Sequence, residues 1–147
     1  ERIVSLKKVP IPFDGSLITQ LGHVSDLTDA MIKCLSQIKT KNNIYNCSGE
    51  KGITIKGLVM ICADVCNIDR NDIELLSFDY RKLDTKSRKS FPIRLNHYHT
   101  SISKIKEDLD WEPKFDLLNG LIDSYKNDYL LANNEQVDFS SDDCLFD

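Results

Sequence analysis

Residues 43–65 read NIYNCSGEKGITIKGLVMICADV, and this stretch decides the fold. The apolar run from Ile44 to Cys47 ends at a serine and a glycine, which is typical of an inner strand of a parallel sheet. Gly52 then allows a turn, and the Thr54 hydroxyl can cap a helix. The helix is expected to pack one apolar stripe on the sheet, formed by Leu58, Ile61, Cys62 and Val65. A strand that leads into a helix in this way is half of a βαβ unit and needs elements on both sides.

The flanking segments supply such elements. A helical stripe of apolar residues runs from Leu27 to Ile38, and we expect its helix to be capped by Ser25. The run from Ile73 to Tyr80 alternates as a strand does. Prolines at alternate positions in Val9 to Gly15 exclude a helix there and confine any strand to a sheet edge. Asp116 can cap a last helix, and the whole order of elements predicts an α/β fold.

Composition argues against several classes of protein. The formal net charge of −4 and the isoelectric point near 5.4 argue against a chain that coats nucleic acid with its whole surface. No apolar run approaches the roughly 18 residues of a membrane span, so we expect no membrane partner. Five cysteines without a CxxC motif indicate a reducing compartment. Cys62 and Cys66 have ligand-like spacing, but such residues more often pack on a sheet, so no metal site is predicted.

The charge changes sign locally in residues 81–94, RKLDTKSRKSFPIR, which carry six basic residues and one acid. A solvated loop is the commoner structure for such a run. Phosphate binding is the alternative, because aromatic and imidazole rings that can stack on unpaired bases lie close by. The candidate substrate- or RNA-binding residues are Arg81, Lys82, Lys86, Arg88, Lys89, Arg94, His97 and Tyr98. For phosphoryl transfer His97 and His99 are the candidate acid and base, although exposed loop histidines are more often bystanders.

Four short motifs resemble, in this order, the C-terminal half of extended short-chain dehydrogenase/reductases of the NAD-dependent epimerase/dehydratase type. They are His23-Val24-Ser25-Asp26-Leu27, Ile44-Tyr45-Asn46 with Ser48-Gly49, Ser103-Lys104 at a helix start, and Leu109-Asp110-Trp111-Glu112-Pro113. The resemblance implies the late parallel strand or strands of a Rossmann-like fold, covering helices and a small substrate-binding subdomain. We therefore expect the C-terminal substrate-binding portion in residues 1–131. Residues 132–147, with five acids and no lysine or arginine, are expected to form a loosely ordered tail.

A more specific resemblance is to the chloroplast stem-loop-binding protein subfamily of plastids and cyanobacteria. It rests on Ile18 to Val24, Asn46 to Lys51, Phe91 to Arg94 with His97, and Phe115 to Asp128. That subfamily is associated with the binding and endonucleolytic cleavage of stem-loop RNA. The resemblance implies RNA as a partner, and the plastid stroma or the cyanobacterial cytoplasm as the location.

The motifs of hydride transfer are missing from this chain. No tyrosine has a lysine four residues later, and Gly49, Gly52 and Gly57 lack the spacing of a dinucleotide-binding turn. We expect no cofactor here, and NAD(P) only in a longer parent that supplies the N-terminal half. Related sugar-nucleotide epimerases hold the diphosphate with two arginines and an aspartate. At those positions this chain has Thr19, Arg94 and His97, which weakens the case for a sugar nucleotide.

Two hypotheses therefore stay open, with a third beside them. The first is a stem-loop RNA-binding protein on a dehydrogenase-like scaffold. The second is an NAD(P)-dependent nucleotide-sugar epimerase, dehydratase or oxidoreductase whose cofactor half lies outside this chain. The third is a scaffold that has lost catalysis and acts by assembly with other copies of itself. The motifs assign no enzymatic activity among these.

Overall fold

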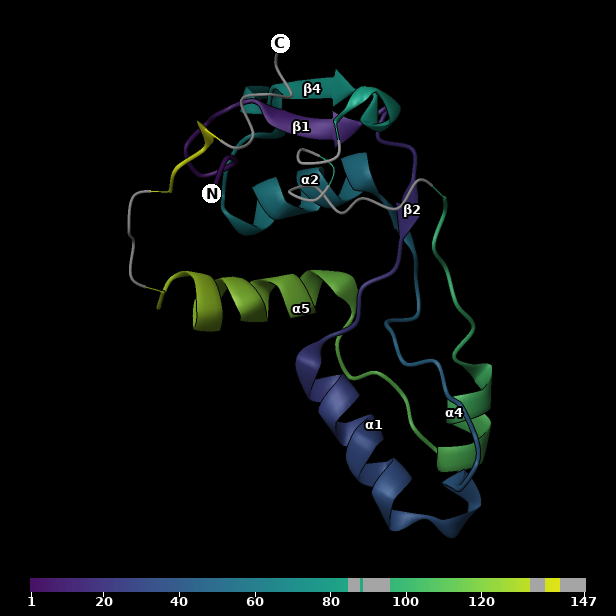
Figure 1. The fold of residues 1–147 in the computed structure, drawn as a ribbon. Helices are drawn as coiled ribbons and strands as arrows, with labels where there is room; N and C mark the ends of the chain where they lie inside the picture. Colours follow the sequence, from purple (N-terminus) through teal and green to yellow (C-terminus); the bar gives the residue numbers. More distant parts are fainter. Residues whose placement is uncertain (85–87, 89–95, 133–136, 141–147) are drawn as a thin grey trace.

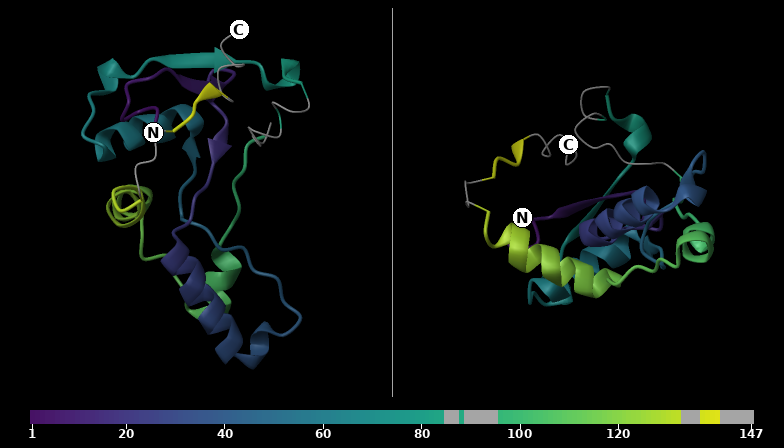
Figure 2. Two further views of the ribbon diagram at one scale, coloured as in Figure 1. Left: turned by 60° about the vertical axis from the view of Figure 1, so that its left-hand side comes forward. Right: turned by 90° about the horizontal axis from the view of Figure 1, so that it is seen from below.

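The structure, a computed structural model, describes residues 1–84, 88, 96–132 and 137–140. These residues form an upper and a lower part (Figure 1). In the upper part a sheet is covered on one face by a helix, with a second helix beyond it. Its elements are β1 (Val9–Pro12), β2 (Ile18–Thr19), β3 (Ile53–Thr54), α2 (Ile55–Val65), β4 (Leu75–Phe78) and α5 (Leu117–Ser124). The lower part holds α1 (Val24–Ser36) and α4 (Ser103–Leu109), which lie side by side also in the left view of Figure 2.

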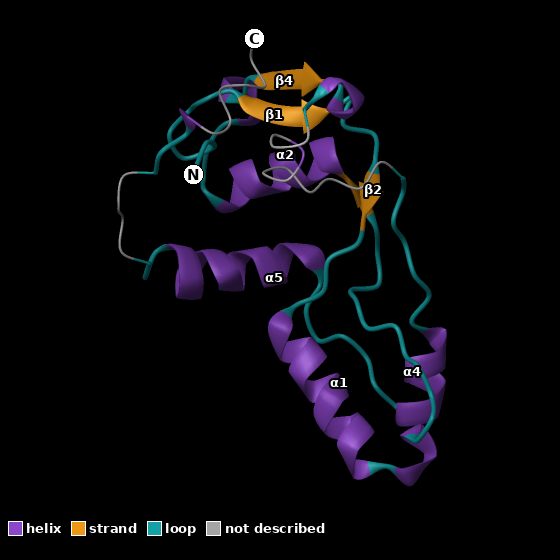
Figure 3. Ribbon diagram, in the orientation of Figure 1, coloured by secondary structure: helices purple, strands orange, loops and turns teal. Residues whose placement is uncertain are grey.

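Strands occur only in the upper part of the described chain, as Figure 3 shows in orange. β1 pairs with β4 in parallel, with Val9 opposite Leu75 and Pro12 opposite Phe78. Because proline has no N–H to donate, β1 can pair on one side only, which confirms the expected edge strand. The helix α2 packs against β1, so a βαβ arrangement is present. Its first strand is β1 and not the strand predicted from Ile44 to Cys47.

The predicted strand from Ile44 to Cys47 is wrong for this chain. These residues run extended, but within the described part of the chain Tyr45, Asn46 and Cys47 make no backbone–backbone hydrogen bond. Ile44 is 86% exposed. A strand needs a neighbour about 4.8 Å away to pair with its amides and carbonyls, and no described segment pairs with this one.

A buried glutamine joins the two short strands to their surroundings. β2 and β3 pair antiparallel, and Gln20 follows β2 directly. Its Nε2 donates to the Gly49 carbonyl oxygen at 2.7 Å, and its Oε1 accepts the Thr100 N–H at 2.7 Å. Three segments distant in sequence are thereby fixed next to one another. The turn at Gly49 is so close to β2 that a Cβ there would lie 2.5 Å from the Leu21 carbonyl oxygen.

The core of the lower part forms between α1, α4 and the chain that follows α4. Ala30 of α1 belongs to it, and the other buried members are Ile102, Ile105, Leu109 and Trp111. The indole N–H of Trp111 donates to the Asp26 carbonyl oxygen at 3.2 Å. The buried Asp26 carboxylate accepts the N–H groups of Lys114 and Phe115, so the charge at this helix start is well solvated by the backbone.

Two helices begin with the caps predicted from the sequence. Thr54 caps α2 by accepting the Gly57 N–H, and Asp116 caps α5 by accepting the Asn119 N–H. Asp110 ends α4 in the left-handed conformation with φ of 48°. At α1, however, the cap is His23 rather than Ser25, since the His23 side chain accepts the Ser25 N–H.

Much of the apolar face of α1 is uncovered by the described chain. Leu27, Met31 and Leu35 are exposed, the last to 89%, and they line a groove with Tyr45 and Cys47. The predicted helical stripe from Leu27 to Ile38 therefore lies on a helix whose apolar face has no described strand against it. None of the described helices is long and apolar enough to cross a membrane.

Candidate nucleic-acid interface

The basic stretch begins in a single 3₁₀ turn, Tyr80–Lys82, which follows β4 directly. Asp79 caps the turn by accepting the Arg81 N–H at 3.0 Å. The same carboxylate binds the Arg81 guanidinium through two hydrogen bonds, from Nε and Nη2, each 2.9 Å long. These hydrogen bonds from Arg81 lower the pKa of Asp79 to about 2 and raise the pKa of Arg81. The charge of Arg81 is therefore balanced within the protein.

Arg88 is held differently, because its partners in the described chain are neutral. Its guanidinium carbon lies 5.7 Å from the centroid of the Tyr80 ring, and its Nη2 donates to the Arg81 carbonyl oxygen at 2.6 Å. The Tyr80 hydroxyl donates in turn to the Arg88 carbonyl oxygen at 3.4 Å. Among the described residues no carboxylate forms an ion pair with Arg88 or Lys82. These two side chains are exposed, so a ligand can reach them.

We call Tyr80, Arg81, Lys82 and Arg88 the β4-end cluster. The ring of Phe13, which follows β1, lies beside it, 5.3 Å from the Arg81 guanidinium carbon. Of the other predicted basic residues, Lys86, Lys89 and Arg94 lie outside the described residues. The structure therefore brings together three of the six predicted cations and shows that one of the three, Arg81, is already paired.

His97 and Tyr98 lie along β2. The Ile18 N–H donates to His97 Nδ1 at 3.1 Å, and the Tyr98 N–H donates to the Ile18 carbonyl oxygen at 2.8 Å. Because His97 Nδ1 accepts, the neutral ring carries its proton on Nε2. In the described structure no hydrogen bond joins a titratable side chain to His97 or His99. The acid and base roles of His97 and His99 therefore stay a prediction.

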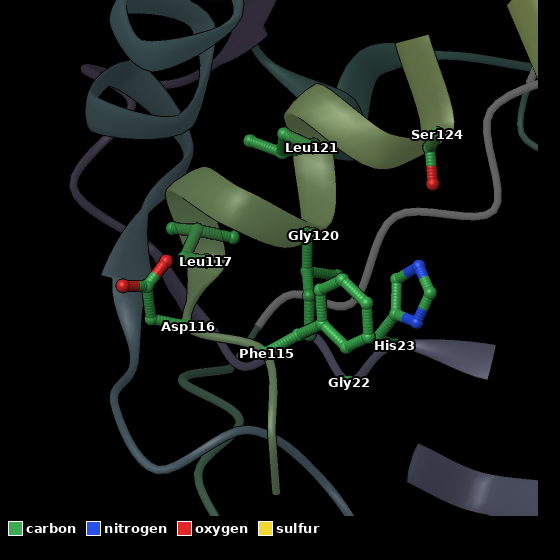
Figure 4. Close-up of a pocket in the computed structure, with 9 residues that line it drawn as sticks. Gly22, His23, Phe115, Asp116, Leu117, Gly120, Leu121 and Ser124 are labelled. Carbon is green, nitrogen blue, oxygen red and sulfur yellow. The ribbon is translucent and has the colours of Figure 1, made fainter. Parts of the chain in front are cut away.

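A small cavity of about 190 Å³ lies between the starts of α1 and α5. Figure 4 shows His23 and Phe115 side by side in its wall, and their rings stack with centroids 3.8 Å apart. His23 is also 3.2 Å from Asp123 through Nε2, and its side chain is only 7% exposed. Both ring nitrogens are engaged, one by Asp123 and one by the cap of α1. Sequence reasoning gave His23 no such role, and its only signal was its place before a helix.

The glycine turn does not suit a dinucleotide. A Cβ at Gly49 would lie 2.5 Å from the Leu21 carbonyl oxygen, and one at Gly52 would lie 2.8 Å from the Ile18 side chain in β2. These glycines therefore allow close packing inside the protein rather than the approach of a phosphate. Between them Glu50 forms an ion pair with Lys106, and hydrogen bonding to Lys106 lowers the pKa of Glu50. The turn at residues 49–52 therefore does not fit the pyrophosphate of NAD(P).

Cys62 and Cys66 line a groove between α2, α5 and the start of the chain. Burial raises the pKa of both thiols, which keeps them protonated and unreactive near neutral pH. In the part of the chain that the structure describes, no three His, Cys, Asp or Glu side chains are placed to hold a metal ion.

The fold is the Rossmann-like fold that NAD-dependent epimerases and dehydratases share. UDP-glucuronic acid 4-epimerase from Bacillus cereus, solved with UDP-glucuronic acid and NAD, matches with a TM-score of 0.70 and 17% identity. The match covers 89% of this chain and 38% of that one. dTDP-glucose 4,6-dehydratase from Bacillus anthracis, solved with NAD, gives a TM-score of 0.66 at 23% identity, over 88% and 38% of the two chains. At such identities the likeness concerns the fold alone.

The sequence relationship is more particular. The chain is 36% identical over 145 residues to the chloroplast stem-loop binding protein of 41 kDa b from Arabidopsis thaliana. The match covers 98% of this chain and 38% of the relative, so the chain spans little more than a third of that protein's length. No family model matches the chain. Both resemblances predicted from the sequence, to the extended dehydrogenase/reductases and to the stem-loop-binding proteins, are confirmed.

Proposed function

We propose that the full-length protein binds stem-loop RNA and that the β4-end cluster forms part of the binding surface. The observation that carries the proposal is the pair of exposed cations, Lys82 and Arg88, that no described carboxylate neutralises in a chain of net charge −4. The name of the Arabidopsis relative, which states stem-loop binding, supports the same ligand. The name also states that the relative is chloroplastic, which supports a plastid location for this protein.

Phosphate binding by this cluster has a measurable electrostatic signature. Each lysine or arginine that contacts a phosphate releases a condensed counterion, so log K falls linearly with log salt. The slope changes by about 0.7 per contact on a single strand and about 0.9 on a duplex. Lys82 and Arg88 are expected to contribute one contact each.

The test uses the full-length polypeptide and a stem-loop RNA over a range of salt concentrations. Lys82→Ala and Arg88→Ala should each weaken binding and flatten the slope by about 0.7 to 0.9. Lys126→Ala is the matched control, since Lys126 is an exposed lysine on the turn after α5, away from the cluster. Binding that is indifferent to salt, or unchanged by the two cluster substitutions, contradicts the proposal.

The second candidate is an NAD(P)-dependent enzyme acting on a nucleotide sugar. The observation that favours it is the fold, which several NAD-bound epimerases and dehydratases share. Since this chain lacks both the glycine-rich turn and the catalytic tyrosine–lysine pair, NAD(P) would bind elsewhere in the full-length parent. Calorimetry of the full-length protein with NAD(H), NADP(H) and UDP-sugars tests it, and no binding of any of them rejects it.

The uncovered face of α1 supports a further proposal, that the N-terminal half of the full-length protein packs against this chain. At 100° per residue, the exposed apolar side chains of α1 occupy an arc of about 140° that the described chain leaves open. The extended segment beside it, around Tyr45, has backbone groups that a further strand could pair with. The remaining sequence of a longer parent can supply such a sheet. Amides of Tyr45 and Cys47 should then be protected from hydrogen exchange in the full-length protein, and rapid exchange contradicts this.

A second copy of the chain is the other occupant to be tested. Sedimentation of the full-length protein separates the cases, because protection in a monomer supports its own N-terminal half. Protection that is lost on dilution to monomers supports assembly with other copies.

A further inference from the structure

The arginine–tyrosine pair of the β4-end cluster has a geometry that simple charge attraction does not need. Arg88 lies over one face of the Tyr80 ring, 5.7 Å from its centroid. Two hydrogen bonds hold the pair together, from Arg88 Nη2 to the Arg81 carbonyl oxygen and from the Tyr80 hydroxyl to the Arg88 carbonyl oxygen. A lysine could provide the charge, but only a guanidinium provides a flat, weakly hydrated plane.

The outer side of this pair faces solvent. Arg88 is exposed and Tyr80 is half-buried, so the ring supports the guanidinium from the protein side. A planar cation held in this way is a surface on which an aromatic base can stack. The cation Lys82 is only two residues from Tyr80, and no described carboxylate pairs with it. A stacking plane and a free cation at one place match one nucleotide, with its base and its phosphate.

We propose that Tyr80 and Arg88 form a binding site for a single unpaired nucleotide of RNA. The base stacks on the Arg88 guanidinium, and Lys82 binds an adjacent phosphate. This inference rests on the proposed RNA-binding function and adds to it that the cluster reads the unpaired loop of a stem-loop rather than the duplex stem. Bases inside a duplex are already stacked on their neighbours and cannot occupy such a site.

The experiment compares two RNAs on the full-length protein: a hairpin with an unpaired loop, and a blunt duplex of the same stem. The loop preference is the ratio of the two affinities. Arg88→Lys keeps the charge but removes the plane, and Tyr80→Ala removes the support. Each should lower the loop preference roughly 5- to 150-fold, the range for losing one stacked base. Tyr80→Phe, which keeps the ring, should keep most of the wild-type loop preference. Lys82→Ala should weaken binding to both RNAs alike.

The outcomes separate this inference from the proposed function. If the wild-type protein binds neither RNA in a salt-dependent way, the proposed function is wrong and this site with it. If it binds both RNAs equally, or if Arg88→Lys and Tyr80→Ala keep the loop preference, RNA binding stands and the nucleotide site is wrong. Thermal unfolding of each variant shows whether the fold is kept, and Arg88→Lys still tests the site if Tyr80→Ala unfolds.

Discussion

Removing one carboxylate, Asp79, should strengthen RNA binding. In the wild-type structure both oxygens of Asp79 are bound to the Arg81 guanidinium, which holds this cation away from any ligand. Asp79→Asn removes the negative charge and leaves an amide oxygen that can still accept the Arg81 N–H and cap the turn. The backbone should therefore stay in place while Arg81 becomes available to phosphate.

The size of the effect follows from counterion release. One additional phosphate contact steepens the plot of log K against log salt by about 0.7 to 0.9. Between about 50 and about 200 mM salt, the affinity of Asp79→Asn should fall about threefold more than that of the wild type, from a higher value at low salt. Fluorescence anisotropy with a labelled stem-loop RNA measures both quantities.

The chain provides a matched control for this prediction. Asp64 binds Arg70 through two hydrogen bonds of 2.8 and 2.5 Å, the same arrangement as the Asp79 pair, but before β4 rather than after it. Asp64→Asn makes the same change in net charge and should leave the slope unchanged. If Asp79→Asn weakens binding or keeps the wild-type slope, or if Asp64→Asn matches its effect, the reasoning is refuted.

Three further predictions concern the fold and the titration of the cluster. Gly49→Ala should lower the free energy of unfolding by about 1–3 kcal/mol, because its Cβ would meet a backbone oxygen at 2.5 Å. A Cβ at Gly120 would have its nearest neighbours at 3.5 Å or more, so Gly120→Ala should raise the free energy of unfolding by about 0.5–1 kcal/mol. Equal effects of the two glycine substitutions in urea unfolding would contradict both expectations. Trp111→Ala should cost about 3–5 kcal/mol by the same measurement, since Trp111 is 1% exposed, and an unchanged midpoint contradicts its core role. The Asp79 carboxyl should titrate at about pH 2 by NMR, and closer to 3.8 in Arg81→Gln. Because the folded-state pKa of Asp79 is lowered, its pair with Arg81 stabilises the fold above about pH 3.8 and stops doing so as the pH falls through about 2. A titration midpoint near 3.8 for Asp79 in the wild type would exclude the pair.

Features decided by local chemistry could be predicted from the sequence. The caps at Thr54 and Asp116 depend on a side chain and an amide three residues later, so spacing alone locates them. The left-handed end at Asp110 and the edge strand with alternate prolines are equally local. The strand at Ile44 was wrong because pairing depends on a neighbour distant in sequence, which an apolar pattern cannot supply.

The candidate site stays a prediction, and the structure shows one charge pairing in it that the sequence analysis missed. Counting charges from Arg81 onward left out Asp79, two residues earlier, which neutralises that arginine. Tyr80 and Arg88 are eight residues apart, and the sequence contains no spacing rule that predicts their contact. The role of Nδ1 in His97 likewise depends on β2, which is about eighty residues away in the chain.

Cross-linking tests the central claim most directly. Ultraviolet irradiation of the full-length protein with a stem-loop RNA joins stacked bases to the side chains they touch, and mass spectrometry identifies the peptide. The account predicts a cross-link in the peptide that contains Tyr80, reduced in Arg88→Lys and increased in yield at low salt. Cross-links confined to peptides outside the β4-end cluster would contradict it.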